Sequence, residues 1–127
     1  IPSTKEISDR RIANAAYYDM HLGKVKQIRI PPRLQNMRCV YYLYIVFAQD
    51  RDALLRYCVE KGIEAKVHYP VPLYQQDGLK FLGYKAGDFP VTDRHVNEII
   101  TFPCDQHLGR AEMDYVVETV RGFYARG

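Results

Sequence analysis

The sequence predicts an α+β domain in which a small, mostly antiparallel sheet has helices packed on one face. Its 127 residues, 47% of them hydrophobic, suffice for one ordinary soluble domain with a core. Segments with helical periodicity and segments with strand periodicity follow one another without internal repeats or low-complexity stretches. Residues 1–127 are therefore expected to form a single domain, with a leading helix in residues 1–24 and the α+β unit in residues 25–127.

The first helix is expected at about residues 4–22. Ser3 and Glu6 have the spacing of a capping box, in which each side chain satisfies a free backbone amide of the first turn. Gly23 stands where a left-handed residue often ends a helix. Helical spacing is kept by Ile12, Ala13, Ala16, Tyr17 and Met20. Because alanines bury little area, this helix and the open face of a small sheet should leave apolar surface uncovered.

Three extended segments are predicted between residues 25 and 69. Residues 25–30 alternate imperfectly before two prolines, which favours a short edge strand. Residues 40–47 are β-branched and aromatic throughout, so they predict the central strand, covered on both faces. Residues 63–69 alternate apolar with polar side chains, the period of a strand with one buried face, and the accessible face includes His68.

A second helix is expected at residues 51–61. Asp50 is a candidate N-cap, and Gly62 is a candidate C-terminal stop. Its apolar stripe is expected to consist of Leu54, Leu55, Cys58 and Val59. These positions predict one face packed on the sheet.

From residue 75 onward, the chain alternates loop, helix and strand. Residues 75–88 contain three glycines and are typical of a surface excursion with one helical turn. A short helix is expected at residues 91–100 and a brief strand at residues 101–102. The helix at about residues 110–125 has the cleanest amphipathic pattern in the sequence and should close the domain.

Charge and hydropathy exclude two classes of partner. The net charge is +3, and the basic residues are scattered from Lys5 to Arg126 without a concentrated stripe, which argues against nucleic acid. No apolar run of about 18 residues is present, which argues against a membrane span or an intact secretory leader. We therefore expect no nucleic acid and no membrane among its partners. The reduced thiols expected for its three cysteines favour a cytoplasmic protein.

Cysteine and histidine spacings give no metal site. Cys39, Cys58 and Cys104 are odd in number and far apart, which fits neither a disulfide framework nor a Cys-x-x-Cys site. Each has apolar neighbours, so each is expected to be a small buried hydrophobe with a reduced thiol. The four histidines never fall within metal-ligand spacing of one another or of a cysteine.

One cluster stands out as a candidate binding site. The segment His68-Tyr69-Pro70-Val71-Pro72-Leu73-Tyr74 places an imidazole, two phenols and two prolines at a predicted strand end. In the functional interpretation, the rigid prolines hold His68 and a tyrosine hydroxyl against a polar ligand. In the structural interpretation, the segment is a proline turn with packed tyrosines, and the residues alone favour this second interpretation. The signatures of dinucleotide, P-loop, zincin and hydrolase-elbow sites do not occur.

Three segments together resemble the C-terminal part of the DegT/DnrJ/StrS family of sugar aminotransferases: residues 64–75, 82–91 and 102–103. The segment around Arg10-Arg11-Ile12-Ala13 is also similar to the family's helix between the large and small domains, and residues 41–46 to its central small-domain strand. The resemblance thus covers essentially the whole chain. Positions 42 and 74, often His in the family, are both Tyr here.

The resemblance implies the small domain of a fold-type-I pyridoxal-phosphate transferase. Family members are dimers that move an amino group from glutamate or a similar donor to a keto-sugar on a nucleotide, in sugar, cell-surface polysaccharide or antibiotic-sugar biosynthesis. The Schiff-base lysine belongs to a large N-terminal domain with no counterpart in these residues. The chain alone is therefore expected to be inactive and to bind no cofactor, and to contain no catalytic or metal-binding residue.

Two alternatives remain open for the role of the chain. In the first, it joins its own N-terminal large domain in a homodimer and lines the nucleotide-sugar cleft through His68, Tyr69 and Tyr74. In the second, it is a stand-alone nucleotide-sugar-binding or dimerisation module without catalysis, because a fold does not fix a function.

Overall fold

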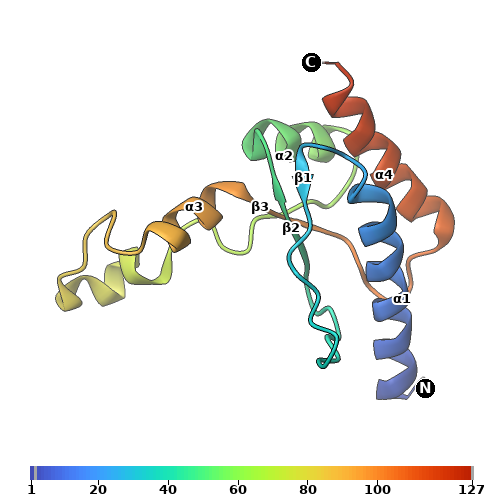
Figure 1. The fold of residues 1–127 in the computed structure, drawn as a ribbon, viewed down its shortest axis with the longest axis horizontal. Coiled ribbons are helices and arrows are strands. Elements are labelled where there is room, and N and C mark those ends of the chain that lie inside the picture. The colour runs from blue at the N-terminus through green and yellow to red at the C-terminus, as the bar shows by residue number, and fades with distance from the viewer. Residues whose placement is uncertain (2, 127) are drawn as a thin grey trace.

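The structure is a computed structural model that describes residues 1 and 3–126. Helices and strands follow one another in the order α1, β1, β2, α2, α3, β3 and α4 (Figure 1). Their bounds are α1 Thr4–Leu22, β1 Ile28–Arg29, β2 Tyr44–Ala48, α2 Arg51–Glu60, α3 Pro90–Glu98, β3 Ile99–Phe102 and α4 Arg110–Tyr124, with 3-10 helices at Leu73–Gln75 and Asp77–Leu82. Within the described residues, no helix combines the length and apolar character needed to cross a bilayer.

The three strands form one antiparallel sheet in the order β1-β2-β3. Ile28 pairs with Ala48 at one edge, and Tyr44 pairs with Phe102 at the other. The core lies on the face of β2 that presents Tyr44, Val46 and Ala48, and the helices α1, α2 and α4 cover this face. The predicted α+β class with a small antiparallel sheet is confirmed.

The opposite face of β2 is less covered than the sequence suggests. Ile45 and Phe47 are only half-buried, so the prediction of a strand covered on both faces is wrong. The strand also begins at Tyr44, four residues later than expected, and Tyr42 before it is 82% exposed. The sheet is small because β1 offers only two residues for pairing. The second face of β2 stays partly exposed because α1, α2 and α4 all pack on the face of Tyr44, Val46 and Ala48.

Residues 63–69 do not form the predicted strand. Their only ladder contact among the described residues is an isolated bridge between Lys66 and Thr101. The alternation nevertheless holds where the segment crosses the core, because Ile63 and Ala65 are each 5% exposed while their neighbours Glu64 and Lys66 face solvent. The segment is extended, but β3 is too short to pair with all of it.

The first helix begins and ends as predicted, at Thr4 and Leu22, but the residue that follows it has another conformation than expected. The Ser3 hydroxyl accepts from the Glu6 amide at 3.3 Å, and the Glu6 carboxylate accepts from the Ser3 amide at 2.6 Å, which completes the capping box. Gly23 has φ −62° and is not left-handed, so that prediction is wrong. A Cβ at this position would stand 2.6 Å from the Asp19 carbonyl oxygen, and this close approach requires the glycine.

Helix α1 exposes apolar side chains on a side that does not pack on the core. The buried apolar residues of this helix are Ala15, Tyr18 and Leu22. Ala13, Ala16 and Met20, on another side of the helix, are exposed, Met20 by 61%. The expectation that this helix exposes apolar surface is confirmed.

The other helices match their predicted positions within a few residues, with corrections. Asp50 has φ 51° and its side chain makes no capping bond, so the predicted cap is wrong, whereas Gly62 is left-handed at φ 79° as expected. Val59 is 56% exposed and does not belong to the apolar stripe. Ile99 already lies in β3, so the predicted helix at 91–100 ends two residues early. The closing helix α4 is confirmed, with Met113, Val116, Val117 and Val120 buried.

The cysteines divide into two groups. Cys58 and Cys104 are buried as expected, and all three thiols are free. Cys39 is exposed, which contradicts the prediction of a buried hydrophobe. It lies in the extended stretch before β2, where no element packs over it.

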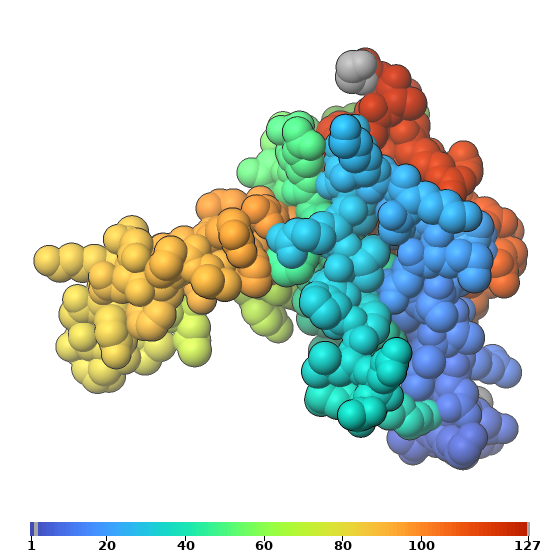
Figure 2. All heavy atoms as spheres, viewed as in Figure 1, coloured from blue at the N-terminus to red at the C-terminus, as the bar shows by residue number. Residues whose placement is uncertain are grey.

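Residues 69–98 form an arm that projects from the sheet, away from α1 and α4 (Figures 1 and 2). It contains the expected excursion at 75–88, with a 3-10 helix at Asp77–Leu82, and ends with α3. A small aromatic cluster stabilises it, because Phe89 lies 4.8 Å from Tyr74 and 5.1 Å from Tyr84 between ring centroids. The arm therefore has a small apolar cluster of its own, apart from the main core.

Candidate functional site

A hollow of about 340 Å³ lies beside His68, between the start of α1, the stretch before β2, residues 64–68 and β3. We call it the His68 hollow. Its lining residues are Arg11, Tyr42, Leu43, Tyr44, Glu64, Lys66, His68, Thr101, Phe102, Pro103, Cys104 and Asp105. Polar groups from four separate parts of the chain therefore converge on one surface.

The alternation in residues 63–69 places three side chains in this hollow. Ile63 and Ala65 turn into the core, so Glu64, Lys66 and His68 share the other side of the extended chain. The prediction that the accessible face of this segment includes His68 is confirmed, although the segment is not a regular strand.

Only one of the two ring nitrogens of His68 has a hydrogen-bond partner among the described residues. Its Nδ1 atom lies 3.0 Å from the Thr101 hydroxyl, and the Thr101 side chain is buried in β3. The backbones of Thr101 and Lys66 exchange two hydrogen bonds of 3.0 and 2.8 Å, which fix the segment against β3. The Nε2 atom bonds to no other described residue, so one ring nitrogen is free to donate to or accept from a ligand.

The charges around the hollow are mixed. The Arg11 guanidinium donates to the carbonyl oxygens of Tyr41 and Tyr42 at 2.9 and 3.2 Å, and so holds the stretch before β2 in place. Lys66 forms an ion pair with Glu64, and both side chains are more than half exposed. An exposed pair of this kind is weak and can exchange its partner for a charged ligand.

The hollow has no activated nucleophile. Cys104 lines it, but burial raises the pKa of this thiol to about 11, so the thiol stays protonated near neutral pH. His68, Lys66 and the hydroxyls nearby can bind and orient a polar ligand by hydrogen bonds and charge. The arrangement is suited to recognition.

The structure separates the two tyrosines of the predicted site. The Tyr69 ring stands perpendicular to the His68 ring at 5.5 Å and is 68% exposed, so it lies next to His68 without lining the hollow. Tyr74 is buried in the arm, where its hydroxyl donates to Asp93 at 2.5 Å and accepts from the Gln75 amide at 2.7 Å. His68 and Tyr69 are thus brought together, and Tyr74 organises the arm.

Sequence reasoning did not single out Arg11, Lys66 or Thr101. Lys66 could have been found, because it stands two residues before His68 in the same alternation. Thr101 is 33 residues from His68 along the chain, and no local sequence pattern predicts the contact. Arg11 likewise reaches the hollow only through the packing of α1.

The lysines of the described chain lack the environment of a Schiff-base lysine. A Schiff-base lysine needs a desolvated or cation-flanked amine, and every lysine in the described chain is exposed. The lysine nearest to His68 in sequence, Lys66, forms an exposed ion pair with Glu64. Among residues 1 and 3–126, no three His, Cys, Asp or Glu side chains are placed to hold a metal ion.

Comparison with known proteins decides the family. Residues 2–121 match the DegT/DnrJ/EryC1/StrS aminotransferase family. The chain belongs to this family. It is 29% identical to the erythromycin biosynthesis sensory transduction protein EryC1 of Saccharopolyspora erythraea, over 88% of this chain and 31% of that protein. It is 28% identical to the dTDP-3-amino-3,6-dideoxy-alpha-D-galactopyranose transaminase of Aneurinibacillus thermoaerophilus, over 91% of this chain and 31% of that protein.

The likeness to DegT/DnrJ/EryC1/StrS enzymes extends to three dimensions. The crystal structure of DesV from S. venezuelae superposes with a TM-score of 0.89 at 26% identity, over 94% of this chain and 32% of that protein. The chain spans about a third of the length of the curated relatives it matches, and corresponds to their C-terminal portion. The predicted family is confirmed.

Proposed function

We propose that this chain is the C-terminal small domain of an aminotransferase that acts on a nucleotide-linked keto-sugar, with glutamate or a similar amino donor. The observation that carries the proposal is the family match over residues 2–121, which falls on the C-terminal third of sugar aminotransferases. Pyridoxal phosphate, held by an N-terminal large domain, would supply the electron-withdrawing chemistry of the reaction.

In this proposal the His68 hollow forms one wall of the sugar-nucleotide cleft. The free Nε2 atom of His68 contacts a hydroxyl or phosphate oxygen of the substrate, and the exposed Tyr69 beside it adds a second polar contact. Lys66 lies on the same side of the segment and attracts the diphosphate. Tyr74 acts more remotely, by holding the arm that starts at Tyr69 in one shape.

The exposed apolar residues provide the interdomain surface. Half of the large exposed hydrophobic side chains belong to the arm: Tyr69, Val71, Leu73, Phe81, Leu82, Tyr84, Phe89 and Val91. So dense an apolar surface on one short segment is typical of an interaction site. The N-terminal large domain and the second subunit of a homodimer are the partners we propose for it and for the exposed face of α1.

The decisive experiment compares the protein with and without a large N-terminal domain. The reading frame upstream of residue 1 is determined, and the longer product is assayed with pyridoxal phosphate, glutamate and a dTDP-linked keto-sugar. We expect amino-sugar and 2-oxoglutarate in equal amounts. The absence of an upstream aminotransferase domain, together with tight nucleotide-sugar binding by the 127-residue chain, would support a stand-alone module instead.

A borohydride experiment on the isolated chain is a second check. Pyridoxal phosphate and borohydride are added to the 127-residue protein, and labelled lysines are located by mass spectrometry. Scattered, substoichiometric labelling is expected, because all described lysines are exposed. Stoichiometric labelling of one lysine, with the matching absorbance band, would contradict the proposed division of labour between two domains.

A further inference from the structure

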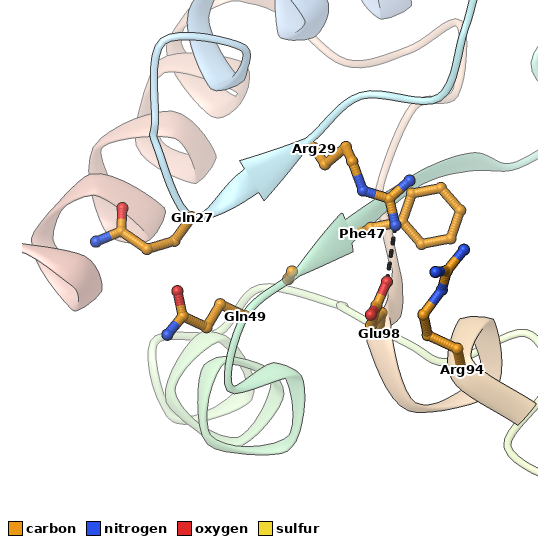
Figure 3. Close-up of a pocket in the computed structure, with 7 residues that line it drawn as sticks. Gln27, Arg29, Phe47, Gln49, Arg94 and Glu98 are labelled. Carbon is orange, nitrogen blue, oxygen red and sulfur yellow. Dashed lines mark hydrogen bonds and ion pairs between the residues drawn. The ribbon is translucent and has the colours of Figure 1, made fainter.

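A second hollow, of about 490 Å³, lies at the open side of the sheet and shares no lining residue with the His68 hollow (Figure 3). We call it the arginine hollow. Its side chains come from the β1 and β2 ends and from α3: Gln27, Arg29, Phe47, Gln49, Arg94 and Glu98. Arg29 and Phe47 are paired across the two strands, so both side chains project from the face opposite the core.

Arg29 contacts the Phe47 ring and the Glu98 carboxylate. Its guanidinium carbon lies 3.8 Å from the centroid of the Phe47 ring, and one terminal nitrogen donates to Glu98 at 2.7 Å. The remaining guanidinium N–H groups bond to no other described residue. A positively charged fork is therefore already oriented before any ligand arrives, which lowers the entropy cost of binding.

Arg94 adds a second guanidinium to the same hollow. It precedes Glu98 by four residues on α3, so both side chains lie on one side of that helix. Figure 3 shows Arg29, Arg94 and Glu98 gathered around the Phe47 ring, with Gln27 and Gln49 at the other end of the hollow. Arg94 makes no hydrogen bond or ion pair to another residue of the described chain.

The charges at the Phe47 end of the arginine hollow do not cancel. Two guanidinium groups face one carboxylate, which leaves an excess of one positive charge beside an aromatic ring. Guanidinium forks match the oxygens of phosphate in geometry and charge, and two forks complement a dianion. Gln27 and Gln49 extend the hollow with neutral donors and acceptors.

We propose that the arginine hollow binds the phosphate monoester group of a small metabolite, with Arg29 and Arg94 as the charged donors. Glu98 positions Arg29, and the non-phosphate part of the ligand extends toward Gln27 and Gln49. The site is separate from the His68 hollow and does not depend on the proposed aminotransferase function.

The test is a binding titration of the 127-residue protein followed by ¹H–¹⁵N NMR, with inorganic phosphate and glycerol 3-phosphate as probes. Sodium chloride at the same ionic strength and sodium succinate serve as parallel arms. We expect saturable shifts of the Phe47, Gln49 and Glu98 amides and of the Arg94 Nε–H group with both phosphate probes. Equal shifts with chloride would overturn the proposal, and tighter binding of succinate would reassign the site to carboxylates.

Variants separate a specific site from general charge attraction. Arg94→Gln should weaken phosphate binding about tenfold, because one charge-assisted contact is lost. Arg56→Gln is the matched control, because Arg56 is an exposed arginine on α2 outside the hollow, and its phosphate affinity should equal that of the parent. Arg94→Lys keeps the charge but loses the guanidinium fork, so its phosphate affinity should lie between those of Arg94→Gln and the parent. An Arg94→Gln affinity equal to that of the control would overturn the proposal.

Discussion

The imidazole of His68 and the hydroxyl of Thr101 lie 3.0 Å apart, although 33 residues separate them in the chain. Thr101 is buried in β3, at the edge where residues 63–69 run past the sheet. Because one ring nitrogen is held by this contact, the other faces the His68 hollow in a defined orientation. Thr101 is thus a positioning residue for His68.

The first prediction concerns this contact. Thr101→Val removes the hydroxyl and leaves the shape, so the His68 ring should lose its fixed orientation. In the longer enzyme that we propose, kcat/KM for the nucleotide sugar should fall about tenfold, the value of roughly one hydrogen bond. Thr101→Ser keeps the hydroxyl and should rescue most of the loss. Equal activity of the Val and Ser variants would show that the contact has no positioning role.

The second prediction tests the core on α2. Leu54 is fully buried, so Leu54→Ala should lower the free energy of unfolding by about 2–5 kcal/mol, through lost burial and a residual cavity. Val59 is on the same helix and 56% exposed, so Val59→Ala should change it by less than about 0.5 kcal/mol. Urea unfolding followed by circular dichroism measures both. Similar costs at the two positions would contradict the packing described for α2.

Local periodicity predicted the elements whose buried residues repeat at a regular spacing. The helix α4 was predicted correctly because Met113, Val116 and Val120 repeat at helical spacing and all face the core. The phase of α1 was less readable, since alanines occur on both its exposed and its buried sides. The segment at 63–69 kept its alternation over residues 63–66 only, since Tyr69, expected on the buried face, is 68% exposed. It lost its strand pairing, because pairing depends on the length of β3, which the segment itself does not encode.

The candidate site was only partly predictable for the same reason. His68 and Tyr69 are sequence neighbours within one unusual motif, and the structure keeps them together. Tyr74 belongs to the same motif, but the proline turn directs it into the arm, where Asp93 bonds to it. Arg11 and Thr101 reach the hollow through tertiary packing, which a single sequence does not display.

The third prediction concerns thiol reactivity and pH. Burial raises the pKa of the Cys58 and Cys104 thiols to about 11, whereas Cys39 is exposed. At pH 8 a thiol with such a pKa is ionised in about one molecule in a thousand, and iodoacetamide reacts with thiolates. Mass spectrometry should therefore find Cys39 alkylated first, with the other two modified only as the pH rises toward 11 or the protein unfolds.

The same shifts set the sign of alkaline instability. The unfolded chain releases its thiol protons near pH 9, before the folded chain does, so the free energy of unfolding should fall as the pH rises from about 9 to 11. Cys58→Ala removes one contributor and should flatten this fall, while Cys39→Ala should not. Rapid labelling of all three thiols at pH 8 in the folded protein would contradict the burial of Cys58 and Cys104.

The fourth prediction separates two roles for Tyr74. Tyr74→Phe keeps the ring packed on Phe89 and removes the hydroxyl that donates to Asp93. Because Asp93 also accepts from the Gly87 amide at 2.9 Å, the arm should loosen, and trypsin should cleave faster after Lys80 and Lys85. Tyr115→Phe, whose hydroxyl donates to the Lys61 carbonyl outside the arm, is the control. Unchanged cleavage in the Tyr74 variant would show that its hydroxyl does not organise the arm.

The most direct measurement of the proposed function is steady-state kinetics of the proposed longer enzyme with His68→Ala. We expect kcat/KM for the nucleotide sugar to fall about ten- to a hundredfold, the loss of one polar contact worth roughly 1–3 kcal/mol. Cofactor binding and the half-reaction with the amino donor should stay unchanged, because the hollow contains no cofactor lysine. His21→Ala, on α1 outside the hollow, should match the parent enzyme. An unchanged kcat/KM in folded His68→Ala enzyme would contradict the assignment of the His68 hollow to the substrate cleft.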